Sequence, residues 1–319
     1  MAMSLLTFGI LHGLTYTGAS TPAPFGLRHI RVETAFTQDE KFNYYPCRFQ
    51  QAGGVREATL RIVRDPRDND LVRNEIRILR ILDGSPQADK FRPYIPNLLD
   101  AFLYQDRTIP LAAAVFERYD GWYSLEDVHR AYPRGVDPKD AAWMWRRLLV
   151  ALGFAHANGI VHGAVLPHNV WIQPEGHGLM LAGWFDAALP SAPACRRCAA
   201  RTVSEVEGRP PHTGEVVSDL DPRFLAWYPR EIVDGEAPTY SADVGMSAKC
   251  MIHLLGGDVD RRTIPDSVPR PMRMFLKGSS RSNDAWALKQ EFDDLLERLW
   301  GQRRFHPFTM ASPINPKEA

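Results

Sequence analysis

Strand-like and helix-like patterns occupy different parts of this sequence, and this separation constrains the fold more than any other feature. Short apolar runs that fit β-strands, such as residues 58–63 and 111–117, lie early in the chain. One helix interrupts them at about residues 69–82, and later on the apolar spacing becomes mostly helical. This order predicts an α+β fold, with a small strand-rich lobe, a larger mainly helical lobe and a boundary near residues 118–122.

The best-signalled element is a helix that begins after Asp137. Asp137 fits the N-cap, Pro138 the first helical position and Gly159 the C-terminal stop. Apolar residues at helical spacing form its buried stripe, namely Ala141, Met144, Trp145, Leu148, Leu149 and Leu152. Further helices are predicted at residues 241–255 and 284–299, and Ser124 with Asp127 has the spacing of a capping box.

Charge and cysteine content exclude several classes of protein. The chain has 38 Lys and Arg residues against 38 Asp and Glu residues, so its formal net charge is zero. A general nucleic-acid binder needs a basic excess, and we therefore expect no nucleic-acid partner. Four cysteines are too few for a disulfide framework, and no apolar run approaches the length of a membrane helix. We expect a soluble, cytoplasmic protein with no membrane partner.

The segment from Phe154 to Val170 resembles the end of the long helix and the catalytic loop of eukaryotic-like protein kinases. The family pattern there is H-R-D-x-x-x-x-N, and His162 and Asn169 match its ends at the right separation. Other pieces follow in the family's order. They are Arg61 in place of the strand lysine, Glu75 on the next helix, Phe116-Glu117-Arg118-Tyr119 at the hinge, Gly183-Trp184-Phe185 in place of D-F-G, Tyr228-Pro229-Arg230-Glu231 in place of A-P-E, Asp243 at the start of the central helix, and a late arginine, Arg281.

This resemblance implies a two-lobed protein-kinase-like fold, in which a small antiparallel sheet with one helix precedes a larger, mainly helical lobe. It divides the chain into an N-terminal extension (1–29), a kinase-like N-lobe (30–119), a kinase-like C-lobe (120–302) and a C-terminal tail (303–319). It also implies two structural contacts. Asp243 should hold the backbone of the catalytic loop around His162, and Glu231 should pair with Arg281.

Four parts that supply the chemistry of active kinases are altered here. The stretch from Thr34 to Phe49, which corresponds to the phosphate-covering loop, contains no glycine. Arg61 replaces the strand lysine, Ala164 replaces the catalytic aspartate and Gly183 replaces the metal-binding aspartate. A methyl group cannot act as a base, and glycine offers no carboxylate to Mg²⁺. The resemblance therefore implies a pseudokinase without catalytic residues, which acts as a protein-binding or regulatory scaffold.

Two other functions stay open. If the D-F-G segment is shifted by three residues, Asp186 restores a carboxylate, and a divergent ATP-dependent phosphotransferase could use Asp186 and Asn169 for a metal. A nucleotide-binding switch without turnover is the other alternative. Its pocket would use the residues that the resemblance assigns to nucleotide, namely Arg61, Glu75, Glu117, Tyr119 and Asn169. For the scaffold we expect no cofactor, whereas both alternatives need ATP, and the enzyme needs Mg²⁺ as well.

Residues 187–228 form a long polar segment with little periodicity, and we expect a protein partner to bind there. Its arginines Arg196, Arg197 and Arg201 form a candidate docking patch. Cys195 and Cys198 have the spacing of a zinc knuckle, but a structural zinc site needs four ligands and His212 is the only nearby candidate. We interpret these cysteines as ordinary thiols, and His168 as a loop histidine rather than a substitute acid or base.

Overall fold

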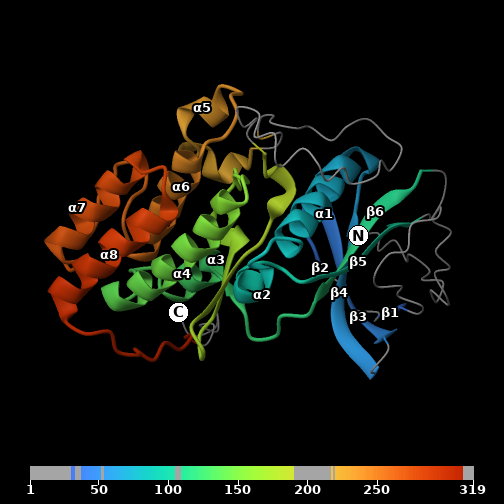
Figure 1. Ribbon diagram of the computed structural model, residues 1–319, viewed down its shortest axis with the longest axis horizontal. Coiled ribbons are helices and arrows are strands. Elements are labelled where there is room, and N and C mark those ends of the chain that lie inside the picture. The colour runs from blue at the N-terminus through green and yellow to red at the C-terminus, as the bar shows by residue number, and fades with distance from the viewer. Residues whose placement is uncertain are drawn as a thin grey trace, which may run out of the picture. The chain divides into compact units, whose positions relative to one another are not determined.

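The computed structural model describes residues 30–32, 37–51, 54–104, 109–189, 217 and 220–311 (Figure 1). The chain divides into two compact units. The strand-rich unit contains the chain up to Ile76 together with Asn97–Asp120, and the helical unit contains Arg77–Pro96 and the chain from Gly121 onward. The two-lobed α+β architecture predicted from the sequence is confirmed, although the segment Arg77–Pro96 groups with the helical unit.

The strand-rich unit is built on one antiparallel sheet. Its strands are β1 (Ile30–Val32), β2 (Thr37–Gln38), β3 (Phe42–Gln51), β4 (Gly54–Val63), β5 (Leu98–Tyr104) and β6 (Leu111–Glu117). They lie in the order β1-β3-β4-β6-β5, and β2 pairs with the other end of β3. Each pair is antiparallel, so the predicted antiparallel sheet is confirmed.

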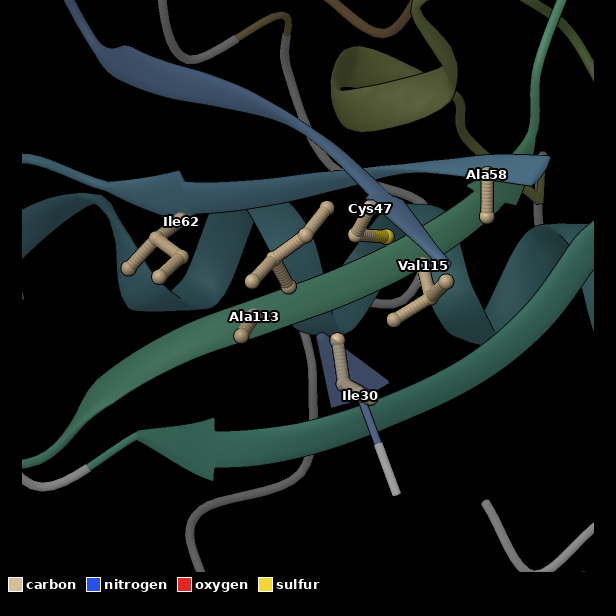
Figure 2. Close-up of a cluster of buried hydrophobic side chains, with 7 residues drawn as sticks. Ile30, Cys47, Ala58, Ile62, Ala113 and Val115 are labelled. Atoms are coloured by element: carbon tan, nitrogen blue, oxygen red, sulfur yellow. The ribbon is translucent and has the colours of Figure 1, made fainter. Parts of the chain in front are cut away.

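Small and aliphatic side chains on one face of this sheet form its core, which Figure 2 shows. The core residues are Ile30, Cys47, Ala58, Leu60, Ile62, Ala113 and Val115. Residues two apart on β4 and on β6 share this face because side chains alternate along a strand. Cys47 is fully buried, as expected for a thiol that serves as a small apolar side chain.

Helices make up most of the helical unit, and α1 (Asn69–Asp83) spans the boundary between the two units. The other helices are α2 (Ala88–Phe91), α3 (Leu125–Ala131), α4 (Pro138–Ala157), α5 (Arg230–Val233), α6 (Tyr240–Leu254), α7 (Arg270–Gly278) and α8 (Ala285–Trp300). Short 3₁₀ turns are η1 (Pro66–Asp68), η2 (Arg92–Tyr94), η3 (Pro167–Asn169), η4 (Trp184–Asp186), η5 (Pro222–Trp227) and η6 (Ser279–Arg281). A small sheet contains β7 (Tyr123–Ser124), β8 (Val170–Gln173) and β9 (Gly178–Leu181).

The core of the helical unit lies along α4, which packs against α6 and α8 (Figure 1). The predicted N-cap of α4 is present, because the Asp137 side chain accepts a hydrogen bond from the Lys139 backbone. Trp145 of α4 is fully buried, with its ring edge-on to Phe292 at 4.7 Å and its indole N–H bonded to Ser247. Among the described residues, no helix is long and apolar enough to cross a membrane.

Candidate functional site

In the strand-rich unit, Arg61 occupies the position that the resemblance assigns to the strand lysine, and an ion pair and two aromatic rings hold its side chain. Arg61 of β4 forms an ion pair with Glu75 of α1, and their exposed fractions are 6% and 1%. The guanidinium of Arg61 lies 4.7 Å from the ring centre of Phe42 and 4.8 Å from that of Phe116. A planar guanidinium can stack on two rings and still bind a carboxylate at its edge, whereas an ammonium lacks this geometry.

The start of α1 is tied to the sheet, and this tie fixes the helix that carries Glu75. The side chain of Asn69 donates to the Pro110 carbonyl at 2.9 Å and accepts from the Ala112 backbone at 2.6 Å. Asn69, the first residue of α1, therefore serves as a bridge between α1 and the beginning of β6. Together with the Arg61–Glu75 ion pair, this bridge holds α1 against the sheet at two points.

The glycine-free stretch from Thr34 to Phe49 is mostly β-strand over its described length. β2 and β3 occupy much of it, and a tight turn at Asp39–Lys41 joins them. The Asp39 carboxylate accepts from the backbone N–H groups of Lys41 and Phe42 at 2.9 and 2.7 Å. Because an aspartate satisfies these N–H groups itself, the turn forms without glycine.

The hinge-like segment at the end of β6 is also bonded within the strand-rich unit. The Glu117 backbone N–H donates to the Asn97 carbonyl at 3.0 Å, and the Tyr119 hydroxyl accepts from the Asn97 backbone at 2.7 Å. Burial is the main reason why the pKa of Tyr119 rises to about 12. The phenol is therefore neutral at physiological pH.

In the helical unit, the loop that follows α4 is anchored by one buried carboxylate. Asp243 of α6 has no exposed surface, and it accepts from the backbone of His162 at 2.7 Å and of Gly163 at 2.8 Å. These are the contacts that the kinase resemblance implies for Asp243. A third partner, which the sequence analysis missed, is His156 of α4, whose Nε2 lies 3.0 Å from the same carboxylate.

His162 is an internal support for this loop. Its Nε2 donates to the Ala182 carbonyl at 2.9 Å, and its Nδ1 accepts from the Ala164 backbone at 3.3 Å. This pattern requires the neutral imidazole. The imidazole is fully buried, and this burial lowers the pKa of His162. Ala164 itself, in the position of the catalytic base, is only 4% exposed and offers no group that takes up a proton.

The two residues in the metal-binding positions contact each other closely. Asn169 donates from its side-chain amide to the Ala164 carbonyl at 2.9 Å. Gly183 has a left-handed backbone, with φ of 74°, and a Cβ added there would lie 2.3 Å from Oδ1 of Asn169. The space that a D-F-G aspartate would need is therefore occupied by Asn169. The remaining donor is one neutral amide oxygen, which does not fit a site for Mg²⁺.

Asp186 does not take the place that the shifted alignment gives it. That alignment needs Trp184 and Phe185 to belong to the preceding strand, but β9 ends at Leu181. Trp184 and Asp186 instead lie on the 3₁₀ turn η4, where the Trp184 ring is fully buried and donates its N–H to the Leu181 carbonyl at 2.8 Å. Among the described residues, no three His, Cys, Asp or Glu side chains are placed to share a metal.

The prediction that Glu231 forms an ion pair with Arg281 is wrong. No ion pair joins these two described residues, because Arg281 is exposed at the end of η6, where Ser279 faces inward instead. Near Glu231 the cation is Lys249 of α6, which donates to the carbonyls of Ala226 and Trp227 at 3.0 and 2.7 Å. Burial, aided by Arg262, lowers the pKa of Lys249, and the carboxylates of Asp260 and Glu231 oppose this shift.

Some predicted features lie outside the described residues or away from these contacts. The cysteines Cys195 and Cys198, His212 and the arginines of the proposed docking patch are not described by the structure. His168 lies on η3, with Nδ1 3.9 Å from the Asp221 carboxylate and its ring against Phe224. Of the residues assigned to a nucleotide pocket, Arg61, Glu75, Glu117 and Tyr119 belong to the strand-rich unit, and Asn169 belongs to the helical unit.

Comparisons with known proteins confirm the protein-kinase-like resemblance. No protein-family model matches the chain. A segment of 110 residues is 32% identical to casein kinase II subunit alpha' of Saccharomyces cerevisiae; it covers 34% of this chain and only 28% of the yeast protein. The solved structure of vaccinia related kinase 3 has a TM-score of 0.60 and 18% sequence identity, over 85% of this chain and 87% of that one. This structural match establishes the fold.

Proposed function

Because the chain is protein-kinase-like in its two-lobed fold, we propose that it is a catalytically inactive member that acts as a protein-binding or regulatory scaffold. The observation that carries this proposal is the contact between Gly183 and Asn169. A metal-binding aspartate is missing from the sequence, and the space for its side chain is filled as well. Phosphoryl transfer needs metal ions that neutralise the developing charge, and this loop holds no carboxylate in that position.

The absence of a base supports the same proposal. Ala164 occupies the position of the residue that accepts the proton of the substrate hydroxyl. A positioned general base contributes about 10²–10⁴-fold to the rate of such reactions. His162 does not replace it, because both of its ring nitrogens are engaged with the backbone and its imidazole is fully buried.

The strand-rich unit supports the proposal of a catalytically inactive protein independently. In active kinases the strand lysine binds the phosphates and the glutamate of the following helix. Here Arg61 is held by Glu75 and by two aromatic rings, so its charge is already engaged within the protein. The N–H groups of Lys41 and Phe42, at the turn before β3, already bind the Asp39 carboxylate, an internal anion.

The scaffold function follows from what these changes leave intact. The fold, the Asp243 anchor and the Arg61–Glu75 ion pair persist, whereas the groups that do chemistry are absent. A protein partner remains a proposal, and so does the partner-binding segment 187–228, most of which lies outside the described residues.

The experiment that tests this proposal is a thermal-shift titration of the full chain with ATP, without metal and with Mg²⁺ or Mn²⁺. A ligand that binds the folded state raises the melting temperature by mass action. The scaffold predicts no shift beyond the one that inorganic tripolyphosphate, run as a control, produces under the same condition. A shift without metal would favour the nucleotide-binding switch, and a shift that requires metal would favour the divergent phosphotransferase.

A direct assay of phosphate transfer complements the titration. The full chain should transfer no labelled phosphate to itself or to generic protein substrates, with Mn²⁺ included alongside Mg²⁺. The double variant Ala164→Asp/Gly183→Asp should also be inactive, because Asn169 blocks the second side chain and Arg61 remains engaged. Transfer that depends on Asp186, tested with Asp186→Asn, would refute the scaffold and establish the shifted alignment.

A further inference from the structure

The helical unit contains a concavity that the kinase-type loops do not line. It has a volume of about 920 Å³ and lies between α4, α8, the turn that joins β8 to β9, and the segment that follows α8. None of the residues discussed for nucleotide, base or metal takes part in it. A volume of this size lies within the range of about 300–1,000 Å³ that is typical of small-molecule sites.

The charge of this cavity is strongly one-sided, although the whole chain is neutral. Six Lys and Arg side chains line it, against two carboxylates, which leaves an excess of four positive charges. The cations are Lys139, Arg146, Arg147, Lys289, Arg303 and Arg304, and the carboxylates are Asp293 and Glu297. We call this cavity the basic pocket.

The carboxylates of the basic pocket do not balance its cations. Asp293 is shared by three of them, since it forms ion pairs with Arg146, with Lys289 at 2.7 Å and with Arg303 at 3.3 Å. The other three cations, Lys139, Arg147 and Arg304, form no ion pair with any carboxylate in the described part of the chain. The nearest polar partner of Arg147 is the Tyr94 hydroxyl, at 2.6 Å.

An aromatic stack forms another part of the lining. The imidazole of His177 lies between the rings of Trp143 and Phe305, with ring centres 4.1 and 4.2 Å away. His177 has a left-handed backbone, with φ of 53°, which is strained for a residue with a side chain. It is 8% exposed, and its Nε2 is buried with no hydrogen-bond partner among the described residues. A buried polar atom without a partner is uncommon in a native fold.

The wall that carries Phe305 is fixed to the rest of the helical unit. His306 contacts the Asp140 carboxylate of α4 through Nδ1 at 2.8 Å. Two residues later, Phe308 is buried, and its ring lies 5.7 Å from that of Tyr132. This segment after α8, with Arg303 and Arg304, is therefore held in position before any ligand arrives, which lowers the entropic cost of binding.

We propose that the basic pocket binds a small anion that carries several phosphate groups. Arginine guanidinium groups match phosphate oxygens in pairs, and four of the six cations are arginines. Three cations without carboxylate partners, spread over α4 and the segment after α8, suit a ligand with several charged groups better than a single phosphate. The concave shape favours a small ligand over an extended strand. The same chemistry could come from a free polyphosphorylated compound or from the headgroup of a phosphoinositide lipid.

The test is a calorimetric titration of the full chain with inorganic tripolyphosphate at physiological salt. We expect one binding site, and an affinity that falls as salt is added. The variant Arg147→Gln/Arg304→Gln removes two exposed cations that form no ion pair, and it should weaken binding by about tenfold or more, because the charge-assisted hydrogen bonds of both guanidinium groups to phosphate are lost. The control variant Arg230→Gln/Arg261→Gln makes the same charge change at side chains that are 91% and 83% exposed outside the pocket, and should bind normally.

Two results would overturn the proposal. One is the absence of binding to the full chain, in solution and on vesicles alike. The other is equal affinity of the pocket variant and the wild type, which would place the anion elsewhere, including at a kinase-type nucleotide site. Co-sedimentation with phosphatidylcholine vesicles, with and without a phosphoinositide, distinguishes the two sources. Binding that needs the lipid and is lost in the pocket variant identifies a headgroup, and binding of tripolyphosphate alone identifies a soluble ligand. The proposal does not depend on the scaffold function.

Discussion

Replacing Asp243 by alanine should destabilise the helical unit more than any other single change at the loop. Its carboxylate accepts from the backbone N–H groups of His162 and Gly163 and lies within hydrogen-bond distance of His156 Nε2. Asp243→Ala removes all three contacts from a site with no exposed surface. No water from bulk solvent reaches these groups without local unfolding, so the N–H groups stay unsatisfied.

The size of the effect follows from the number of donors left without an acceptor. A buried donor that loses its partner costs about 1–3 kcal/mol. Two backbone N–H groups therefore give a loss of about 2–6 kcal/mol, and we expect about 4 kcal/mol. In a unit of this size, 1 kcal/mol shifts the melting temperature by about 2–4 °C, so the expected decrease is about 8–16 °C.

The tryptophans make a selective assay available. All eight lie at or after residue 122, within the helical unit, so intrinsic fluorescence during heating or urea unfolding reports on that unit alone. The matched control is Asp266→Ala in the same unit, which removes a carboxylate that is 95% exposed and paired with Arg273. Such a surface change should alter stability by no more than about 0.5 kcal/mol.

A small effect would refute this reasoning. If Asp243→Ala shifted the fluorescence transition no more than Asp266→Ala does, the carboxylate would not be the anchor of the loop. Asp243→Asn gives an intermediate case, because its amide oxygen can accept one of the two N–H groups while its amide nitrogen opposes the other. We expect its transition to lie between those of the wild type and Asp243→Ala.

Three further changes test other contacts. Gly183→Asp should lower the stability of the folded state by about 2 kcal/mol or more in thermal denaturation, because the new Cβ would clash with Asn169 and the backbone φ at this position is 74°. An unchanged melting temperature would show that the loop can open to accept the side chain. Arg61→Met should lower the free energy of unfolding by about 3–5 kcal/mol in calorimetry, since it leaves Glu75 buried without its cation. The double variant Arg61→Met/Glu75→Leu should recover most of this stability. A double variant as unstable as the single one would contradict the argument. The free energy of unfolding should fall as the pH is lowered from about 7 to about 5, because burial lowers the pKa of several histidines and the unfolded chain then binds protons that the folded chain does not. Each such proton contributes up to about 1.4 kcal/mol per pH unit. A free energy of unfolding in urea that did not change with pH would count against this reasoning. These histidines are His129, His162, His177 and His253, and the pKa of His253 falls to about 4.

Much of the fold could be predicted because its signals are local. Asp137 and Pro138 mark the start of α4, and the capping box of Ser124 and Asp127 is present as predicted. These signals depend on backbone groups within one turn of the residue, so neighbouring sequence is enough to find them. By contrast, the turn within the glycine-free stretch was not predicted, because it is closed by hydrogen bonds to the Asp39 carboxylate rather than by a glycine.

The pairing of side chains that are distant in the sequence was predicted less well. Arg281 has the right place in the sequence to pair with Glu231, but it lies exposed on η6, and it is the charge of Lys249 that this glutamate influences. His156 and Phe42 had no sequence signal that marked them as partners of Asp243 and Arg61. Such contacts depend on how helices and strands pack, and a shift of one side chain is enough to change the partner.

The sequence by itself determined the two-lobed order of strands and helices, and it determined which residues stand at the positions that the kinase resemblance assigns to the base and to the metal ligand, because the identity of a residue is a matter of covalent structure. Tertiary structure alone decided what fills those positions. It placed Asn169 in the space beside Gly183, enclosed Arg61 between two rings, and gathered six cations from α4, α8 and the following segment into the basic pocket of a neutral chain. The physical reason is that composition sums charges over the whole chain, whereas binding depends on the charges within a few ångströms of one another, and only packing sets those distances.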